Sequence, residues 1–171
     1  MSTVTTDKKG GGMASLAGKY LTFRLAAEEY GLEILKVQEI IKMQDITKIP
    51  RAPGFVRGVI NLRGKVIPVV DLRLKFDMQT LETTVKTCII VVQVKKAAFT
   101  VTMGIIVDEV NEVLDVNGEQ IEPAPEFSAV VETSFILGIG KVGKKVVILL
   151  DVNKVLASGE IDALTKAEVA A

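Results

Sequence analysis

The residues best suited to chemistry lie in the segment Gly138–Lys145, where glycines and lysines are closely spaced. Gly138-Ile-Gly-Lys-Val-Gly143 matches the G-x-G-x-x-G pattern, and with Lys144 it nearly matches a P-loop. In both motifs a glycine turn brings backbone N–H groups to phosphates at the start of a helix. Here an apolar, β-branched run follows and predicts a strand, and Lys145 replaces the Ser or Thr that would bind magnesium. We interpret the segment as a hairpin turn, with a nucleotide-using enzyme as the alternative.

Acidic residues offer two further possibilities. Asp71 and Asp151 could form a carboxylate pair for acid–base catalysis, but each follows an apolar run and precedes a turn or short helix. We therefore interpret both as capping residues. Asp108, Glu109 and Glu112 form an acidic cluster without neighbouring ligands at metal spacing, which favours a solvated surface over a calcium site.

The composition excludes several classes of function. The chain has no His and one Cys, which removes the commonest general base and any Cys-based zinc site. We expect no metal, no cofactor and no catalytic residue. The 21 basic and 21 acidic residues and the absence of Trp argue against nucleic acid, the second alternative function. No apolar run is long enough to insert into a membrane. The single Cys88 suits a reducing cytosol.

Three blocks of sequence recur in the same order, which indicates two copies of one small unit. The blocks and their second copies are Gly31–Ile41 with Gly104–Leu114, Ile49–Pro53 with Ile121–Pro125, and Gly58–Leu72 with Gly138–Val152.

Each copy offers about five short strands, among them Tyr20–Leu25, Lys65–Val70 and Cys88–Val94, together with a helical turn over Gly54–Ile60. This pattern predicts an all-β chain of two small barrels with short helices. Units of this size are marginal alone, so we expect the barrels to share a hydrophobic interface.

The expected division of the chain follows the order of the repeats. Residues 1–17 form a disordered N-terminal tail, residues 18–86 the first barrel and residues 87–157 the second. Residues 158–171 form a C-terminal helical tail.

Four segments carry a family resemblance: Glu29–Ile40, Gly58–Gly64, Ile67–Leu72 and Pro123–Phe127. Together they resemble the CheW-like coupling proteins of bacterial chemotaxis, and the likeness runs from about residue 18 to residue 156. It implies two SH3-like five-stranded barrels and a non-catalytic adaptor that couples methyl-accepting chemoreceptors to the histidine kinase CheA. The implied partners are the regulatory domain of CheA and the cytoplasmic tips of the receptors, and the implied location is the cytoplasm, at membrane-bound receptor arrays. With 171 residues, a standalone coupler is expected rather than a kinase.

The resemblance also implies two sets of site residues. Receptor binding falls on Val37, Glu39, Gly58, Arg63 and Gly64, and kinase binding on Gly104 and Gly138. Structural alternatives stay open: Val37 as a core residue, the glycines as requirements of backbone geometry, and Arg63 as the partner of an acid such as Glu39.

Overall fold

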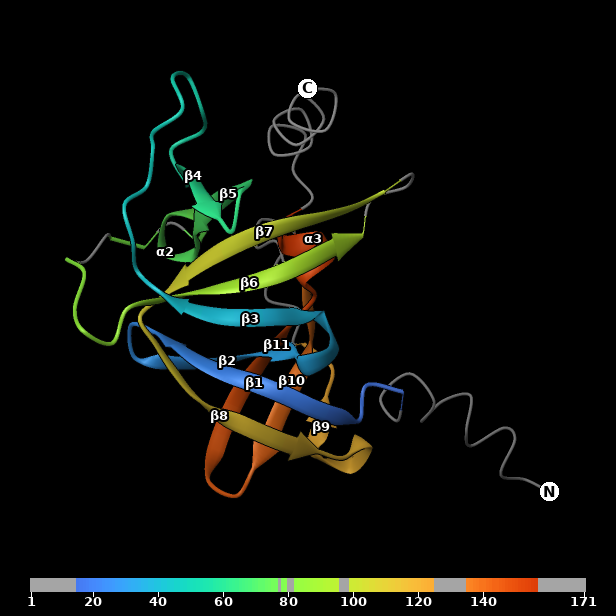
Figure 1. The fold of residues 1–171 in the computed structure, drawn as a ribbon. Coiled ribbons are helices and arrows are strands. Elements are labelled where there is room, and N and C mark those ends of the chain that lie inside the picture. The colour runs from blue at the N-terminus through green and yellow to red at the C-terminus, as the bar shows by residue number, and fades with distance from the viewer. Residues whose placement is uncertain (1–14, 77, 80–81, 96–98, 125–134, 157–171) are drawn as a thin grey trace.

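The computed structural model describes residues 15–76, 78–79, 82–95, 99–124 and 135–156. The predicted C-terminal tail, and all but the last three residues of the predicted N-terminal tail, lie outside the described residues. Within the described part, the strands form two sheets that lie one above the other in Figure 1. No helix in that part is long and apolar enough to cross a membrane.

The first sheet has six strands in the order β8-β1-β2-β11-β10-β9, and we call it the six-stranded barrel. Its strands are β1 (Gly18–Leu25), β2 (Glu28–Glu33), β8 (Glu109–Val116), β9 (Ile121–Glu122), β10 (Ile136–Val142) and β11 (Lys145–Leu150).

The second sheet has five strands in the order β3-β6-β7-β5-β4, and we call it the five-stranded barrel. Its strands are β3 (Val37–Lys42), β4 (Val56–Leu62), β5 (Lys65–Asp71), β6 (Cys88–Lys95) and β7 (Thr100–Val107). The helices are short: η1 (Ile34–Lys36), α2 (Leu72–Lys75), η2 (Gly118–Gln120) and α3 (Val152–Val155). The predicted all-β, double-barrel fold is confirmed, but one barrel has six strands rather than the expected five because the two-residue strand β9 pairs with β10.

The two barrels exchange strands, so the predicted division into residues 18–86 and 87–157 does not describe the sheets. Strands β1 and β2 join the six-stranded barrel, whereas β6 and β7 join the five-stranded one. Each repeat therefore crosses from one barrel to the other, first through η1 and then at Asp108, between β7 and β8. The sequence-based division failed because it assigned neighbouring strands to one barrel.

The internal repeat is preserved in the pairing of the strands. Strand β2 pairs in parallel with β11, placing Gly31 opposite Leu149. Strand β7 pairs in parallel with β5, placing Gly104 opposite Val69. The two pairs occupy equivalent positions in the repeat, so the two halves are arranged alike despite the exchange of strands.

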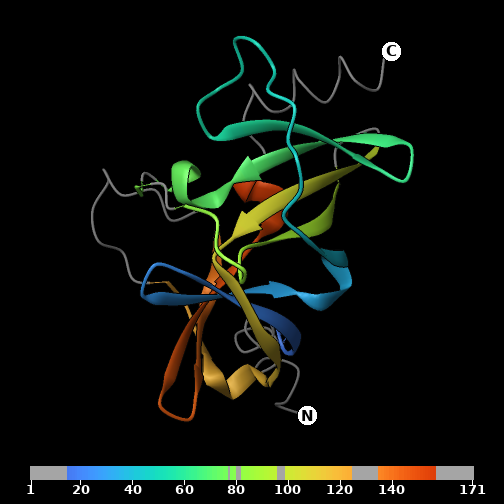
Figure 2. The ribbon, with the colours of Figure 1, turned by 60° about the vertical axis from the view of Figure 1, so that its left-hand side comes forward.

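Apolar side chains form three clusters, one in each barrel and one between the barrels. The shared cluster takes Leu21 and Phe23 from β1 and Val92 and Met103 from the other sheet. Tyr20, on the opposite face of β1, packs inside the six-stranded barrel. Strand β1 is thus buried on both faces, because it lies between a barrel interior and the interface (Figure 2). The predicted shared hydrophobic interface is confirmed.

The helical turn predicted over Gly54–Ile60 is wrong. Residues 56–62 form β4, which pairs with β5 along its length. Side chains at Val56 and Ile60 are buried while those between them alternate in exposure, as period-2 packing requires. Pairing with β5 therefore overrides the local turn signal of Pro53 and Gly54.

The exchange of strands predicts that the two sequence halves cannot fold separately. A fragment of residues 1–86 lacks both neighbours of its β1–β2 hairpin, and a fragment of residues 87–171 lacks both neighbours of β6–β7. We expect each to be largely unfolded by circular dichroism and to gain strand structure when the two are mixed. Residues 34–108, which contain all five strands of one sheet, are the matched control and should retain more strand structure than either half. Cooperative unfolding of either half by itself would contradict the prediction.

Candidate functional site

The glycine- and lysine-rich segment forms a hairpin, as the sequence predicted. Strand β10 ends at Val142 and β11 begins at Lys145, with Gly143 in the turn at φ 62°. Because a strand follows the glycines, no helix N-terminus faces a phosphate here. The geometry required for nucleotide binding by this motif is absent from the segment.

Asp71 and Asp151 are helix caps. The Asp71 carboxylate accepts a hydrogen bond from the Arg73 backbone N–H at 3.0 Å, and Asp151 accepts one from Asn153 N–H at 3.0 Å. Each thereby satisfies an N–H at the start of a short helix. The capping interpretation is confirmed for both residues.

The acidic cluster is divided among separate cations. Asp108 pairs with Arg73, Glu109 with Arg24, and Glu112 with Lys145. Among the described residues, no group of three or more acids, His or Cys is placed to hold a metal ion. The cluster is therefore a set of ion pairs at the crossover and on the strand that follows it.

Three of the predicted receptor-binding residues meet at one end of the five-stranded barrel. Glu39 lies on β3, while Arg63 and Gly64 form the turn between β4 and β5. The Arg63 guanidinium makes a two-pronged pair with the Glu39 carboxylate, with Nη1–Oε1 at 3.1 Å and a second bond from Nη2 to Oε2. The pair connects the edge strand β3 to the hairpin. The internal partner suggested for Arg63 is therefore present.

The turn itself explains why Arg63 is presented outward. Arg63 and Gly64 both have positive φ, 51° and 87°, as a two-residue hairpin turn of type I′ requires. Asn61 Oδ1 accepts a hydrogen bond from Gly64 N–H at 2.8 Å and fixes this turn. The Arg63 side chain stays 66% exposed despite its pair with Glu39. It can therefore donate further hydrogen bonds to a partner.

A polar hollow of about 450 Å³ opens beside this pair. It is lined by Gln38, Leu62, Arg63, Lys65, Ile67, Gln93 and Thr102. Hydrogen bonds from Arg63 lower the pKa of Glu39, and this outweighs the opposing effect of burial. Glu39 is thus charged at neutral pH, and the hollow offers cations and amides to a partner's carboxylates or backbone.

Val37 and Gly58 have structural contacts of their own. The half-buried Val37 packs against the shared apolar cluster. Gly58 is buried at φ 141°, and a Cβ there would lie 2.0 Å from the Thr47 carbonyl oxygen. That carbonyl accepts from Val59 N–H at 2.8 Å, so the close approach belongs to the pairing of β4 with the segment after β3. The structure thus gives Gly58 a packing role independent of any partner.

Gly104 and Gly138 are buried in the walls of different barrels. A Cβ at Gly104 would lie 2.8 Å from Cγ2 of Ile89, and one at Gly138 would lie 2.8 Å from Cγ2 of Ile121. The two glycines therefore do not lie together in one site. Both allow close packing inside a barrel, and their predicted role in kinase binding stays a prediction.

The six-stranded barrel has matching features that the sequence-based analysis missed. Glu112 stands where the repeat places Glu39, and it pairs at 2.9 Å with Lys145 of the β10–β11 hairpin. Large apolar side chains are also exposed at equivalent positions of the two barrels, Ile40 with Val113 and Val66 with Val146. Comparing the repeats position by position could have found the acidic pair. The exposure of the apolar side chains could not have been found in this way, because it depends on which strands share a sheet.

The sequence also did not reveal a polar network where the barrels join. Arg73 Nε donates to Asp108 Oδ1 at 2.7 Å and Nη2 donates to Oδ2 at 2.5 Å, a fork-to-fork pair. The backbone N–H of Ala26, in the β1–β2 turn, donates to the same carboxylate at 2.8 Å. Burial opposes the charge on Asp108, but the hydrogen bonds from Arg73 and Ala26 outweigh it and lower the pKa of Asp108.

The lowered pKa predicts how this network responds to acid. A carboxyl whose pKa is depressed by folding stabilises the protein above its unfolded pKa of about 4 and loses that contribution as pH falls through the folded pKa. We expect Asp108→Asn to lower the free energy of unfolding by about 2 kcal/mol at pH 7. The deficit should shrink as pH falls below about 4. Urea unfolding over this pH range measures it, with Asp115→Asn, in an exposed pair with Lys19, as the control. A deficit independent of pH would contradict the assignment.

The fold and the site define a class of protein. The described residues gather no metal-binding cluster, and the glycine motif lacks phosphate-binding geometry. What the two barrels present instead is an exposed arginine on a rigid turn and apolar side chains at matched surface positions. These are features of a protein-binding scaffold module.

Comparison with known proteins gives the family. The family model described as the CheW-like domain matches residues 19–160. Chemotaxis protein CheW of Klebsiella aerogenes is 41% identical over 154 residues, covering 87% of this chain and 90% of that protein. The Rhizobium meliloti protein of the same name is 36% identical over 143 residues, covering 84% and 90%. The chain belongs to the CheW-like family, which is a family of chemotaxis scaffold proteins.

A solved structure agrees with this assignment. The scaffolding protein TtCheW from Thermoanaerobacter tengcongensis superposes with a TM-score of 0.74 at 37% sequence identity, covering 84% of this chain and 95% of that one. The match supports two SH3-like barrels as the architecture of this chain.

Proposed function

We propose that this chain is a non-catalytic adaptor that couples chemoreceptors to the histidine kinase CheA. Membership of the CheW-like family is the observation that carries the proposal. The resemblance of its motifs to those of chemotaxis coupling proteins names the two partners. In this role the protein acts in the cytoplasm and is recruited to membrane-bound receptor arrays.

The receptor-binding site is proposed at the end of the five-stranded barrel that carries Glu39, Arg63 and Gly64, and at the adjoining junction of the barrels. Leu35 supports the extension to the junction, because it lies in η1 at the crossover between barrels and is 93% exposed. An exposed leucine four residues before Glu39, the partner of the cationic turn, suits an amphipathic helix bearing acidic residues, the helix-in-groove mode of binding. Val37 would support this surface by packing against the apolar cluster below it. Gly58 would contribute by holding β4 in place.

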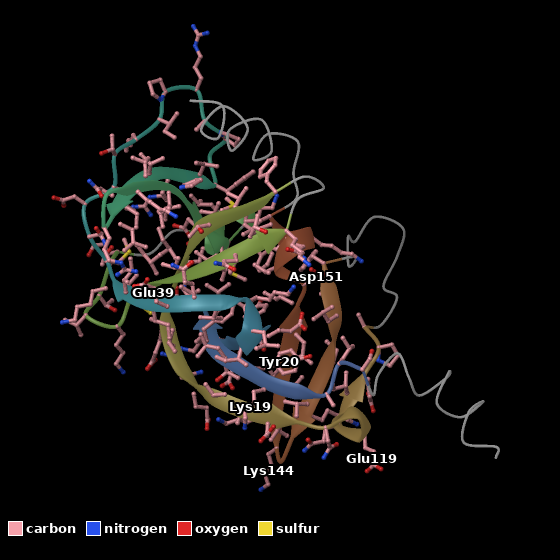
Figure 3. The ribbon with its side chains drawn as sticks, turned by 45° about the vertical axis from the view of Figure 1, so that its right-hand side comes forward. Lys19, Tyr20, Glu39, Glu119, Lys144 and Asp151 are labelled. Atoms are coloured by element: carbon pink, nitrogen blue, oxygen red, sulfur yellow. The ribbon has the colours of Figure 1, made fainter. Side chains whose placement is uncertain are left out.

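The kinase-binding site is proposed on the six-stranded barrel. Its β10–β11 hairpin has Gly143 and Lys144 in its turn, where the other barrel has Arg63 and Gly64. The exposed Val113 and Val146 add an apolar surface to this barrel. Figure 3 shows Lys144 at the tip of its hairpin, far from Glu39. Two partners could thus bind different barrels at the same time. Gly138 would contribute through the packing of its barrel wall, and Gly104 through that of the other barrel.

The mechanism requires no turnover. Because both partners would bind one double barrel, a small change in the relative orientation of the barrels would suffice to pass a signal from receptor to kinase.

The direct test is a pulldown of the purified chain with a receptor cytoplasmic fragment and with the regulatory domain of CheA, separately and together. We expect binding to each and a ternary complex in the presence of both. Binding to only one partner, or competition between the two, would refute the coupling role. Calorimetry with ATP addresses catalysis, and saturable ATP binding lost in Lys144→Ala would revive the enzyme alternative.

A further inference from the structure

Two short helices tie the barrels together at equivalent positions of the repeat. Helix α2 follows the five-stranded barrel's β4–β5 hairpin, and α3 follows the six-stranded barrel's β10–β11 hairpin. Arg73 on α2 and Asn153 on α3 are equivalent residues of the repeat. Arg73 bonds to Asp108 at the crossover and Asn153 to Lys95 at the end of β6, so both helices add polar bonds to the apolar core of the interface.

The tie at Arg73 is charged and multiple. Its guanidinium donates hydrogen bonds to both carboxylate oxygens of Asp108, the residue at which the chain crosses between barrels. It also donates from Nη1 to the Gln79 carbonyl at 2.9 Å. The Asp108 carboxylate accepts in addition from Ala26 N–H in the six-stranded barrel, and Asp108 N–H donates to the Arg24 carbonyl at 3.1 Å. Arg73 is only 10% exposed. These bonds fix one crossover to elements of both barrels.

Among the described residues, the tie at Asn153 is a single neutral bond. Its side-chain oxygen accepts from Lys95 N–H, at the end of β6, at 2.9 Å. The crossover on this side of the repeat has Leu35 where the other has Asp108, and Leu35 lies exposed on η1. Charge-assisted, two-pronged hydrogen bonds are roughly twice as strong as neutral ones and fix orientation more narrowly. The two ties are therefore unequal, although the repeat makes their positions equivalent.

We propose that the Arg73–Asp108 pair is the fixed pivot that sets the angle between the two barrels, and that the Asn153 side is the one that yields. Arg73 and Asp108 are thus positioning residues for coupling rather than contacts for a partner. Because the angle between the barrels is fixed only at the Asp108 crossover, a partner that binds at the exposed Leu35 crossover can rotate one barrel relative to the other. This last consequence rests on the proposed adaptor function; the pivot itself does not.

The test measures the inter-barrel distance without any partner. Lys65→Cys and Lys144→Cys place one spin label on each barrel's hairpin, in a Cys88→Ala background that removes the native thiol. Pulsed electron–electron double resonance then reports the distance distribution between the labels. We expect Arg73→Lys, which keeps the charge but removes the fork, to broaden the distribution or shift its mean by about 2 Å or more. Asn153→Ala should produce a smaller change.

The controls separate orientation from stability. Asp115→Asn removes an exposed pair within the six-stranded barrel and should leave the distribution unchanged. Asp108→Asn keeps an acceptor for Ala26 N–H and serves as the second pivot variant. If Arg73→Lys and Asp108→Asn lower the unfolding midpoint but leave the distance distribution as in the unmodified pair, the bonds only stabilise the fold and the pivot is refuted. A larger change in Asn153→Ala than in Arg73→Lys would also overturn it.

The functional consequence has a separate readout. In a reconstituted mixture with receptor fragment and CheA, the pivot variants should keep both binary interactions and lose most of the receptor-dependent change in kinase activity. Loss of a binary interaction in Arg73→Lys would instead make the residue a contact. Failure of the unmodified chain to couple at all would refute the proposed function and leave the distance measurement standing.

Discussion

Gly58→Ala is expected to destabilise the protein by about 3 kcal/mol or more, a large effect for a single methyl group. The added Cβ would lie 2.0 Å from the Thr47 carbonyl oxygen, which is backbone and cannot rotate away. The φ of 141° adds strain, because side chains other than glycine rarely adopt it. Relief would require the pairing of Thr47 with Val59 to break. Urea unfolding measures the loss.

Gly54→Ala is the matched control, since no atom lies within 4 Å of a Cβ built there. It should leave the unfolding midpoint nearly unchanged. Receptor binding by Gly58→Ala, measured at a temperature where it is still folded, then separates packing from contact. We expect any weakening of binding to follow the loss of β4 geometry. A fully stable Gly58→Ala that fails to bind receptor would show that Gly58 is a contact residue.

The sequence predicted the fold class but not the assignment of strands to barrels. Alternating and apolar runs correctly identified strands such as Tyr20–Leu25 and Cys88–Val94, because burial on one or two faces leaves a local pattern. The choice of partner strand leaves no such pattern. That β2 pairs with β11, far along the chain, depends on long-range packing of the shared core. The same reason explains why Gly54–Ile60 was assigned as a turn.

For the site, the sequence was a better guide to which residues matter than to which residues contact one another. The sequence left open whether Arg63 contacts a partner or pairs with Glu39, and treated the two as rivals. The structure shows the internal pair, yet Arg63 is still exposed, so the two roles are compatible. The Arg73–Asp108 tie was invisible because its members are distant in sequence and Asp108 appeared to belong to an acidic cluster.

The repeat links these observations. An acid and two exposed apolar residues stand at equivalent positions of both barrels. In each barrel the acid pairs with a cation of the hairpin, Arg63 in one and Lys145 in the other. The two repeats differ, among other positions, at Arg63 against Gly143 in the hairpin turns and at Asp108 against Leu35 in the crossovers. The difference at the hairpin turns is where distinct partner binding is expected, because the shared positions already satisfy the common fold.

Arg63→Glu is expected to weaken receptor binding by about thirtyfold or more, as loss of a central arginine contact typically does. The reversal removes the exposed guanidinium and places a second carboxylate beside that of Glu39, so that two like charges stand at the same end of the barrel. Stability should change little, because the pair is exposed and the turn is held separately by Asn61 and Gly64. Calorimetric titration with a receptor cytoplasmic fragment measures the affinity, and Lys144→Glu on the other barrel's hairpin is the matched control.

The charge-swapped double variant decides how Arg63 acts. Glu39→Arg with Arg63→Glu restores an ion pair between β3 and the hairpin but reverses the charge at the tip of the turn. If Arg63 served only to hold the hairpin against β3, the swap would recover receptor binding. We expect it not to, because the turn is already fixed by its own hydrogen bond and the exposed guanidinium is the group available to a partner's carboxylate. Recovery in the double variant would make Arg63 a structural residue, and unchanged binding in Arg63→Glu alone would remove it from the receptor site.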